Sequence, residues 1–212
     1  MKYLTFLLIS GLLVPPGVQA HDGTHADPPA AASVPAPNLQ AALRTLWHGH
    51  VEKTRDYALA IKAGDAKRSE AAANAVVANA KQLADAVAGF YGAAAGERML
   101  TLLAGHWGAV KVMTDAEHAG NREAVNAAMT TLTQNAGEIA VFLSGANPYL
   151  PQDAVRGLLL AHGAHHGAQI GEVMRGDSAA EAKTWAAMQK HMDVIADAMA
   201  GALAKQFPKK AS

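Results

Sequence analysis

Histidine recurs in this sequence at a fixed interval, and imidazole is the side chain that binds metals or exchanges protons most readily near neutral pH. His50, His106 and His162 are each 56 residues apart. A second set with the same interval consists of Asn79, Asn135 and His191. Apolar positions and Gly-Asp or Gly-Asn steps follow the same period, so the sequence predicts three copies of one structural unit.

The third copy is the richest in histidine. His162 and His166 are four residues apart, so they share one face of a helix and can chelate one ion. His191 takes the place that asparagine has in the other copies, so three imidazoles are predicted to converge there. His50 and His106 are possible further ligands. Copper, zinc or iron would suit such ligands.

Carboxylates and cysteines set limits on this predicted site. Glu138 and Glu172 are the nearest candidate carboxylate ligands. The chain has no cysteine, which excludes disulfides, thiolate metal sites and c-type haem attachment. A metal would therefore be held by imidazole, carboxylate or an amino terminus.

Two other interpretations use the same residues. Each histidine could pair with the asparagine at its level on the partner helix, which would make the polar layer purely structural. Haem b with histidine ligation is a further alternative, because Gly163, Gly167 and Gly171 form a bare stripe beside His162. Close helix packing explains that glycine stripe more simply.

Each 56-residue unit is predicted to be a helical hairpin. Helix-favouring residues dominate, and the hairpin turns fall at three glycine steps followed by capping residues: Gly64-Asp65, Gly120-Asn121 and Gly176-Asp177. The expected fold is all-α, with units at about 39–94, 95–150 and 151–206 forming a six-helix domain over 39–208. Sequence leaves open whether the hairpins form a pseudo-threefold ring or another bundle.

The N-terminus is typical of an exported protein. Lys2, a short apolar run and Val18-Gln19-Ala20 form the parts of a signal peptide at 1–20. A Pro- and Ala-rich tether is expected at 21–38, where His21 and His25 are secondary candidates for copper binding. We expect a periplasmic or secreted protein with no membrane span after signal removal.

Charge and motifs exclude several function classes. The formal net charge is zero, so no broad basic surface is expected to recruit nucleic acid. No glycine-rich phosphate loop or nucleophile elbow is present. An enzymatic role is therefore left open but not favoured, and no reaction, protein partner or oligomeric state is predicted.

Several motifs carry a resemblance to a family of small bacterial helical proteins without an assigned activity. The matching segments are Leu46-Trp47-His48-Gly49-His50 with Thr54-Arg55, Phe90-Tyr91-Gly92, Asn135 to Ala140 with Phe142-Leu143-Ser144 and Ala146-Asn147-Pro148, and Gln206-Phe207-Pro208. The sequence is similar to that family over nearly the whole helical domain. It departs from the family pattern at Gln82, where an acidic residue is expected, and at His166, where threonine is expected.

Two functional hypotheses follow. The first is an exported metal-binding protein in which His162, His166 and His191 are central. The second is a non-catalytic envelope or interaction protein with a structural His/Asn layer.

Overall fold

The computed structural model describes residues 36–211, and these residues are helical with short connections. The expected signal peptide at 1–20, most of the expected tether at 21–38, His21 and His25 lie outside the described residues. Seven helices occur in the described part of the chain: α1 (Pro37–Lys62), α2 (Ala66–Tyr91), α3 (Ala93–His118), α4 (Arg122–Ala146), α5 (Gln152–Arg175), α6 (Ser178–Gln206) and the short α7 (Pro208–Ala211). The all-α fold expected from the sequence is confirmed.

The hairpin turns fall at the predicted glycine steps. Gly64, Gly120 and Gly176 have φ values of 68°, 69° and 73°, in the left-handed region that glycine adopts without a steric penalty. The next residue then caps the following helix: Asp65, Asn121 and Asp177 each accept a hydrogen bond from the backbone N–H three residues later. Local sequence alone therefore explains where α1, α3 and α5 end.

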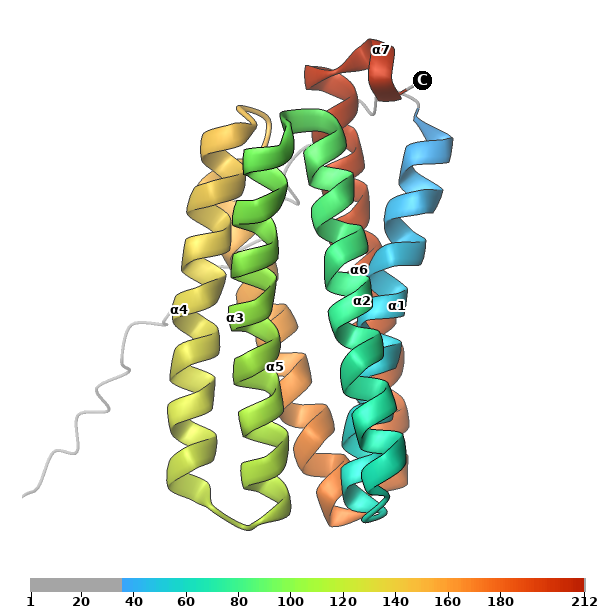
Figure 1. Cartoon of the computed structure of the whole chain (residues 1–212), viewed down its shortest axis with the longest axis vertical. Helices are drawn as coiled ribbons and strands as arrows, with labels where there is room; N and C mark the ends of the chain where they lie inside the picture. The colour runs from blue at the N-terminus through green and yellow to red at the C-terminus, as the bar shows by residue number, and fades with distance from the viewer. Residues whose placement is uncertain (1–35, 212) are drawn as a thin grey trace, which may run out of the picture. The chain divides into compact units, whose positions relative to one another are not determined.

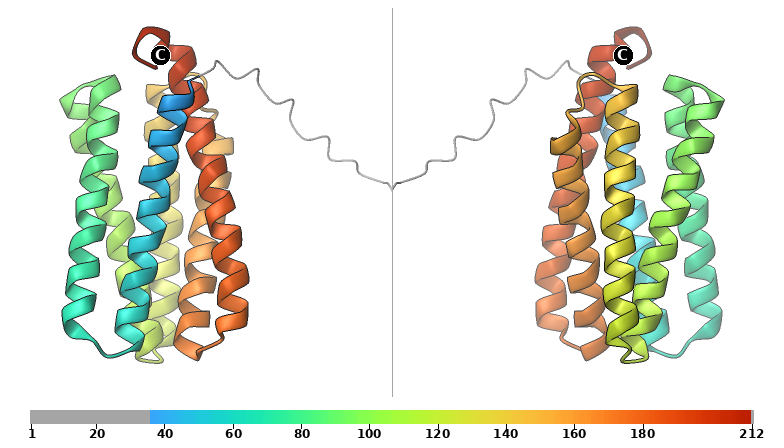
Figure 2. Two further views of the ribbon diagram at one scale, coloured as in Figure 1. Left: turned by 90° about the vertical axis from the view of Figure 1, so that its right-hand side faces the viewer. Right: turned by 90° about the vertical axis from the view of Figure 1, so that its left-hand side faces the viewer.

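The six long helices form a closed ring. Each helix packs against the next in sequence, and α6 packs against α1 (Figures 1 and 2). Helices α1, α3 and α5 also contact one another, whereas α2, α4 and α6 bridge between them. The first helix of every hairpin therefore lines the centre, which is a pseudo-threefold arrangement.

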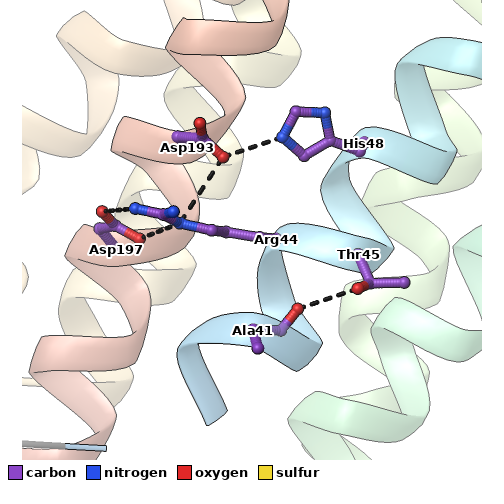
Figure 3. A network of polar contacts seen from close by, with 6 residues as sticks. All are labelled: Ala41, Arg44, Thr45, His48, Asp193 and Asp197. Atoms are coloured by element: carbon purple, nitrogen blue, oxygen red, sulfur yellow. Dashed lines mark hydrogen bonds and ion pairs between the residues drawn. The ribbon is translucent and has the colours of Figure 1, made fainter. Parts of the chain in front are cut away.

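A polar network joins the first and last long helices where the ring closes (Figure 3). The Arg44 guanidinium donates to both carboxylate oxygens of Asp197, at 2.8 and 2.6 Å. His48 lies 2.8 Å from Asp193, which also pairs with Arg44. These groups are partly exposed, so they orient α1 on α6 more than they stabilise the fold.

The end of the ring away from the hairpin turns is fixed by a second polar network. The Tyr91 hydroxyl donates to Gln206 and accepts from the Asn147 side chain. The Gln206 amide donates in turn to the Ala146 carbonyl, and Phe207 packs edge-on against the Tyr91 ring. Three of the motifs behind the family resemblance therefore meet here and have a structural role.

Apolar side chains fill the ring on both sides of one polar level. On α1 one apolar cluster extends to Val51 and the next begins at Tyr57; on α3 the corresponding limits are Leu103 and Trp107. His106 lies between these clusters on α3, and His50 lies next to Val51, the last α1 residue of the first cluster. The repeated histidines therefore form a polar layer at the boundary between two apolar clusters. None of the described helices is both long and apolar enough to cross a membrane.

Candidate metal centre

Four histidines meet at the centre of the ring: His50 on α1, His106 on α3, and His162 and His166 on α5. They converge because α1, α3 and α5 are the inner helices and each carries a histidine at the same level. One nitrogen from each ring can be chosen so that all four lie within 4.8 Å of one another. All four are buried, with exposed fractions of 3%, 5%, 1% and 1% respectively.

The four rings contact one another directly. The His162 and His166 centroids are 4.4 Å apart, and every other pair is separated by 5.4–5.7 Å. The Nε2 atoms of His162 and His166 are 3.0 Å apart, so one ring donates and the other accepts. A tetrahedral ion with bonds of about 2.0–2.1 Å needs nitrogen pairs about 3.3 Å apart, so small side-chain movements would bring the set to binding distance.

Two of these rings carry buried nitrogens without a hydrogen-bond partner. They are His106 Nε2 and His162 Nδ1. An unpaired buried polar atom costs about 1–3 kcal/mol, and native structures contain few of them. A layer whose sole purpose was to join helices would be expected to pair its nitrogens.

Burial keeps these imidazoles uncharged. Desolvation, together with the nearby charges of His106 and Lys53, lowers the pKa of His50 to about 3. Desolvation lowers the pKa of His106 to about 4, although the neighbouring Asn135 side chain opposes this shift. The pKa values of His162 and His166 are lowered well below the usual range by burial and by the other rings. Neutral imidazole is the form that binds a metal.

The second set of repeated polar residues has a different role from the pairing expected. Asn79, Asn135 and His191 each lie 2.8–3.0 Å from a backbone carbonyl, that of Leu46, Leu102 and Leu158 respectively. Each carbonyl belongs to the residue one turn before the repeated histidine. These side chains therefore hold the two helices of a hairpin in register, and His191 lies outside the four-histidine group.

The Asn79 and Asn135 amides are oriented by these bonds. Because the amide nitrogen donates to a carbonyl, the amide oxygen is left as an acceptor, and both oxygens are buried without a partner. A metal-bound imidazole usually donates its second N–H to an oxygen of this kind. Asn135 lies beside His106, where it can serve that purpose.

The predicted carboxylate ligands are not in the four-histidine group. Glu138 is exposed on α4. Glu172 is half-buried and accepts a hydrogen bond from the Thr184 hydroxyl at 3.0 Å, while its second oxygen is buried without a partner. The grouped ligands are therefore four neutral imidazoles.

The glycine stripe on α5 serves close helix packing. A Cβ at Gly163 would lie 3.2 Å from Leu132, and one at Gly167 would lie 2.6 Å from Met129, both on α4. Side chains of the neighbouring helix thus fill the space beside Gly163 and Gly167, whereas Gly171 lies against the Arg175 side chain of α5 itself. The four imidazoles contact one another and leave no flat space between them, so the haem alternative gains no support.

The sequence predicts the convergence of His50 and His106 with the third unit only in part. It indicates these two residues as possible further ligands and His191 as the one that completes the site. The signal for the observed grouping is His166, which stands where the other units have Thr54 and Val110. A pseudo-threefold ring places three repeated histidines on one axis, and His166 adds a fourth.

Comparison with protein-family models, with curated proteins and with solved structures found no match.

Proposed function

We propose that this protein binds one first-row transition-metal ion, copper or zinc, through His50, His106, His162 and His166. The observation that supports the proposal most directly is the grouping of four buried imidazoles, each with a nitrogen within 4.8 Å of the others. Imidazole suits both metals, and four such ligands complete a tetrahedral shell. Iron, which the sequence also allowed, is less suited because the group includes no carboxylate.

The charge of the site favours copper(I) over a divalent ion. Four neutral ligands leave the full charge of the ion in an apolar core, and burying a charge costs free energy unless a counter-charge is near. The buried Glu181 carboxylate is already bound by Arg55, at 2.6 and 3.0 Å. A monovalent ion buries one charge instead of two, so copper(I) is the preferred ion in this proposal and zinc is the alternative.

A filled shell argues for carrying or storing metal instead of catalysis. Catalytic zinc sites keep one position open for water or substrate, whereas four imidazoles leave none. With the expected signal peptide at 1–20, the proposed role is metal handling in the periplasm or outside the cell.

The test is a titration with Zn²⁺ and, under reducing conditions, with Cu⁺, on the protein without an affinity tag. The parent is expected to bind one ion per chain. His162→Ala and His106→Ala should each lower the affinity at least tenfold. His118→Ala, which removes an exposed imidazole at the end of α3, is the matched control and should bind as the parent does. Failure of the parent to bind either ion would overturn the proposal.

The alternative is a purely structural polar layer. It is favoured by the bonds of Asn79, Asn135 and His191 to backbone carbonyls, which need no metal. It predicts that His162→Ala changes the thermal stability equally with and without metal. If metal raises the melting temperature of the parent but not of the variant, the structural alternative is excluded.

A further inference from the structure

The α5/α6 hairpin carries three histidines that its 56-residue equivalents lack. His166 belongs to the four-histidine group, and the other two are His165 and His191. Their equivalents in the first two units are Lys53 and Ala109 for His165, and Asn79 and Asn135 for His191. Holding this hairpin in register does not require a histidine at position 191, because asparagine makes the same bond in the other two units.

His165 and His191 lie together at the protein surface. Their ring centroids are 5.4 Å apart, and both side chains are partly exposed. His191 Nε2 is 2.8 Å from the Leu158 carbonyl. Because a carbonyl only accepts, Nε2 carries the proton and Nδ1 keeps a free lone pair. The pair can therefore offer one ring nitrogen from each histidine to an ion in water.

The surface pair adjoins the buried group. His165 precedes His166 in the chain and lies one turn from His162. His191 bonds the carbonyl of Leu158, one turn before His162, so both members of the pair lie close to the level of the buried group. An ion held at the surface pair is thus separated from the buried rings by a short distance along α5.

We propose that His165 and His191 form a capture site that receives a metal ion from solvent and passes it to the buried histidines. The two imidazoles displace water from the ion, and the buried rings then displace these two imidazoles in turn. The hydrogen bond between the His162 and His166 Nε2 atoms breaks as the ion enters, and the proton that it holds moves to the other nitrogen of the donor ring, which leaves both Nε2 lone pairs free for the metal. This inference rests on the proposed function, because it supplies an entrance to a site whose ligands are at most 5% exposed.

The equivalent surfaces of the other hairpins do not offer ligands to a cation. On α1 the Lys53 ammonium lies over Gly49 and donates to its carbonyl, so it would repel a positive ion. Between α3 and α4 a groove of about 350 Å³ is lined by glycine, alanine and valine with a single threonine. Of these three equivalent positions, the α5/α6 surface alone presents imidazoles.

The test measures two quantities in the parent and in the variants: the rate at which metal is loaded and the affinity at equilibrium. The double variant His165→Ala/His191→Asn introduces residues that the other units already have at these positions, and the introduced asparagine is expected to keep the bond to Leu158. Loading with Zn²⁺ and, in separate runs, with Cu⁺ is followed by stopped-flow transfer from a chromophoric chelator. His48→Ala, which removes another partly exposed histidine, is the control.

We expect the double variant to bind one ion per chain with affinity within threefold of the parent, but to load at least tenfold more slowly. The control should load at the parental rate. A double variant that loads within twofold of the parental rate would overturn the capture site and leave the proposed function intact. Loss of the equilibrium site would also overturn it, since the pair would then be part of the final ligand set. A parent that takes up neither ion would overturn the proposed function as well.

Discussion

Acid should destabilise the metal-free protein steeply because its buried histidines must remain uncharged. The unfolded chain binds a proton at each histidine below about pH 6.5, whereas folding lowers the pKa of His106 to about 4 and that of His50 to about 3. The unfolded state therefore binds more protons in this window. The stability contributed by each neutral ring is complete above pH 6.5 and is lost as the pH falls toward its folded pKa.

The magnitude follows from the width of that window. Each such histidine costs about 1.4 kcal/mol per pH unit below 6.5. At pH 5, His50 and His106 together remove about 4 kcal/mol, and His162 and His166 act in the same direction. A domain is usually stable by about 5–15 kcal/mol, so a large part of the stability of the metal-free protein should disappear by pH 5.

The assay is urea unfolding at pH 7 and pH 5 in the presence of a chelator. The matched variant is His166→Val, which introduces the residue found at the equivalent position 110. It should lose about 2 kcal/mol less than the parent between the two pH values, because one fewer buried group titrates. His118→Ala is the control and should lose as much as the parent. A parent whose stability differs by less than about 1 kcal/mol between pH 7 and pH 5 would refute this reasoning.

Three further predictions concern the scaffold. Gly96→Ala should lower the free energy of unfolding by about 1–3 kcal/mol, because its Cβ would lie 2.7 Å from a side chain and 3.0 Å from a carbonyl on α2. The added Cβ of Gly108→Ala would meet nothing within 4 Å, so this variant should instead be more stable by about 0.5–1 kcal/mol. Thermal melts of both variants would check the contrast. Asn135→Ala removes the donor to a backbone carbonyl and should cost about 1–3 kcal/mol in urea unfolding; an unchanged midpoint would contradict the register role. Arg55→Ala leaves the buried Glu181 carboxylate without its bidentate partner, so the pKa of Glu181, which Arg55 lowers in the parent, should rise. NMR titration of that carboxyl group in parent and variant measures the shift, and an unchanged pKa would contradict the prediction.

The fold was predictable because its signals are local and periodic. A glycine followed by Asp or Asn ends one helix and caps the next, and this step occurs at equal intervals in the three hairpins. Such signals do not define how hairpins pack around one another. The ring depends on contacts between α6 and α1, which are far apart in sequence.

The site was predicted in its residue type and level but not in its final membership. His162 and His166 share a helix face, as four-residue spacing requires, and both belong to the buried group. His191 was expected to join them because it is level with His162 across the hairpin. Its ring instead bonds the Leu158 carbonyl. The other members of the buried group are His50 and His106, from the other two inner helices. Only the packing of three hairpins brings those rings together.

X-ray absorption spectroscopy of the metal-loaded protein tests the central proposal most directly, because it counts the imidazoles bound to the ion. We predict four nitrogen neighbours at about 2.0–2.1 Å with the outer-shell scattering of imidazole rings. That pattern should be lost in His162→Ala and kept in His118→Ala. A shell dominated by oxygen, or with two or fewer imidazoles, would show that the buried histidines do not hold the metal and would contradict the proposed function.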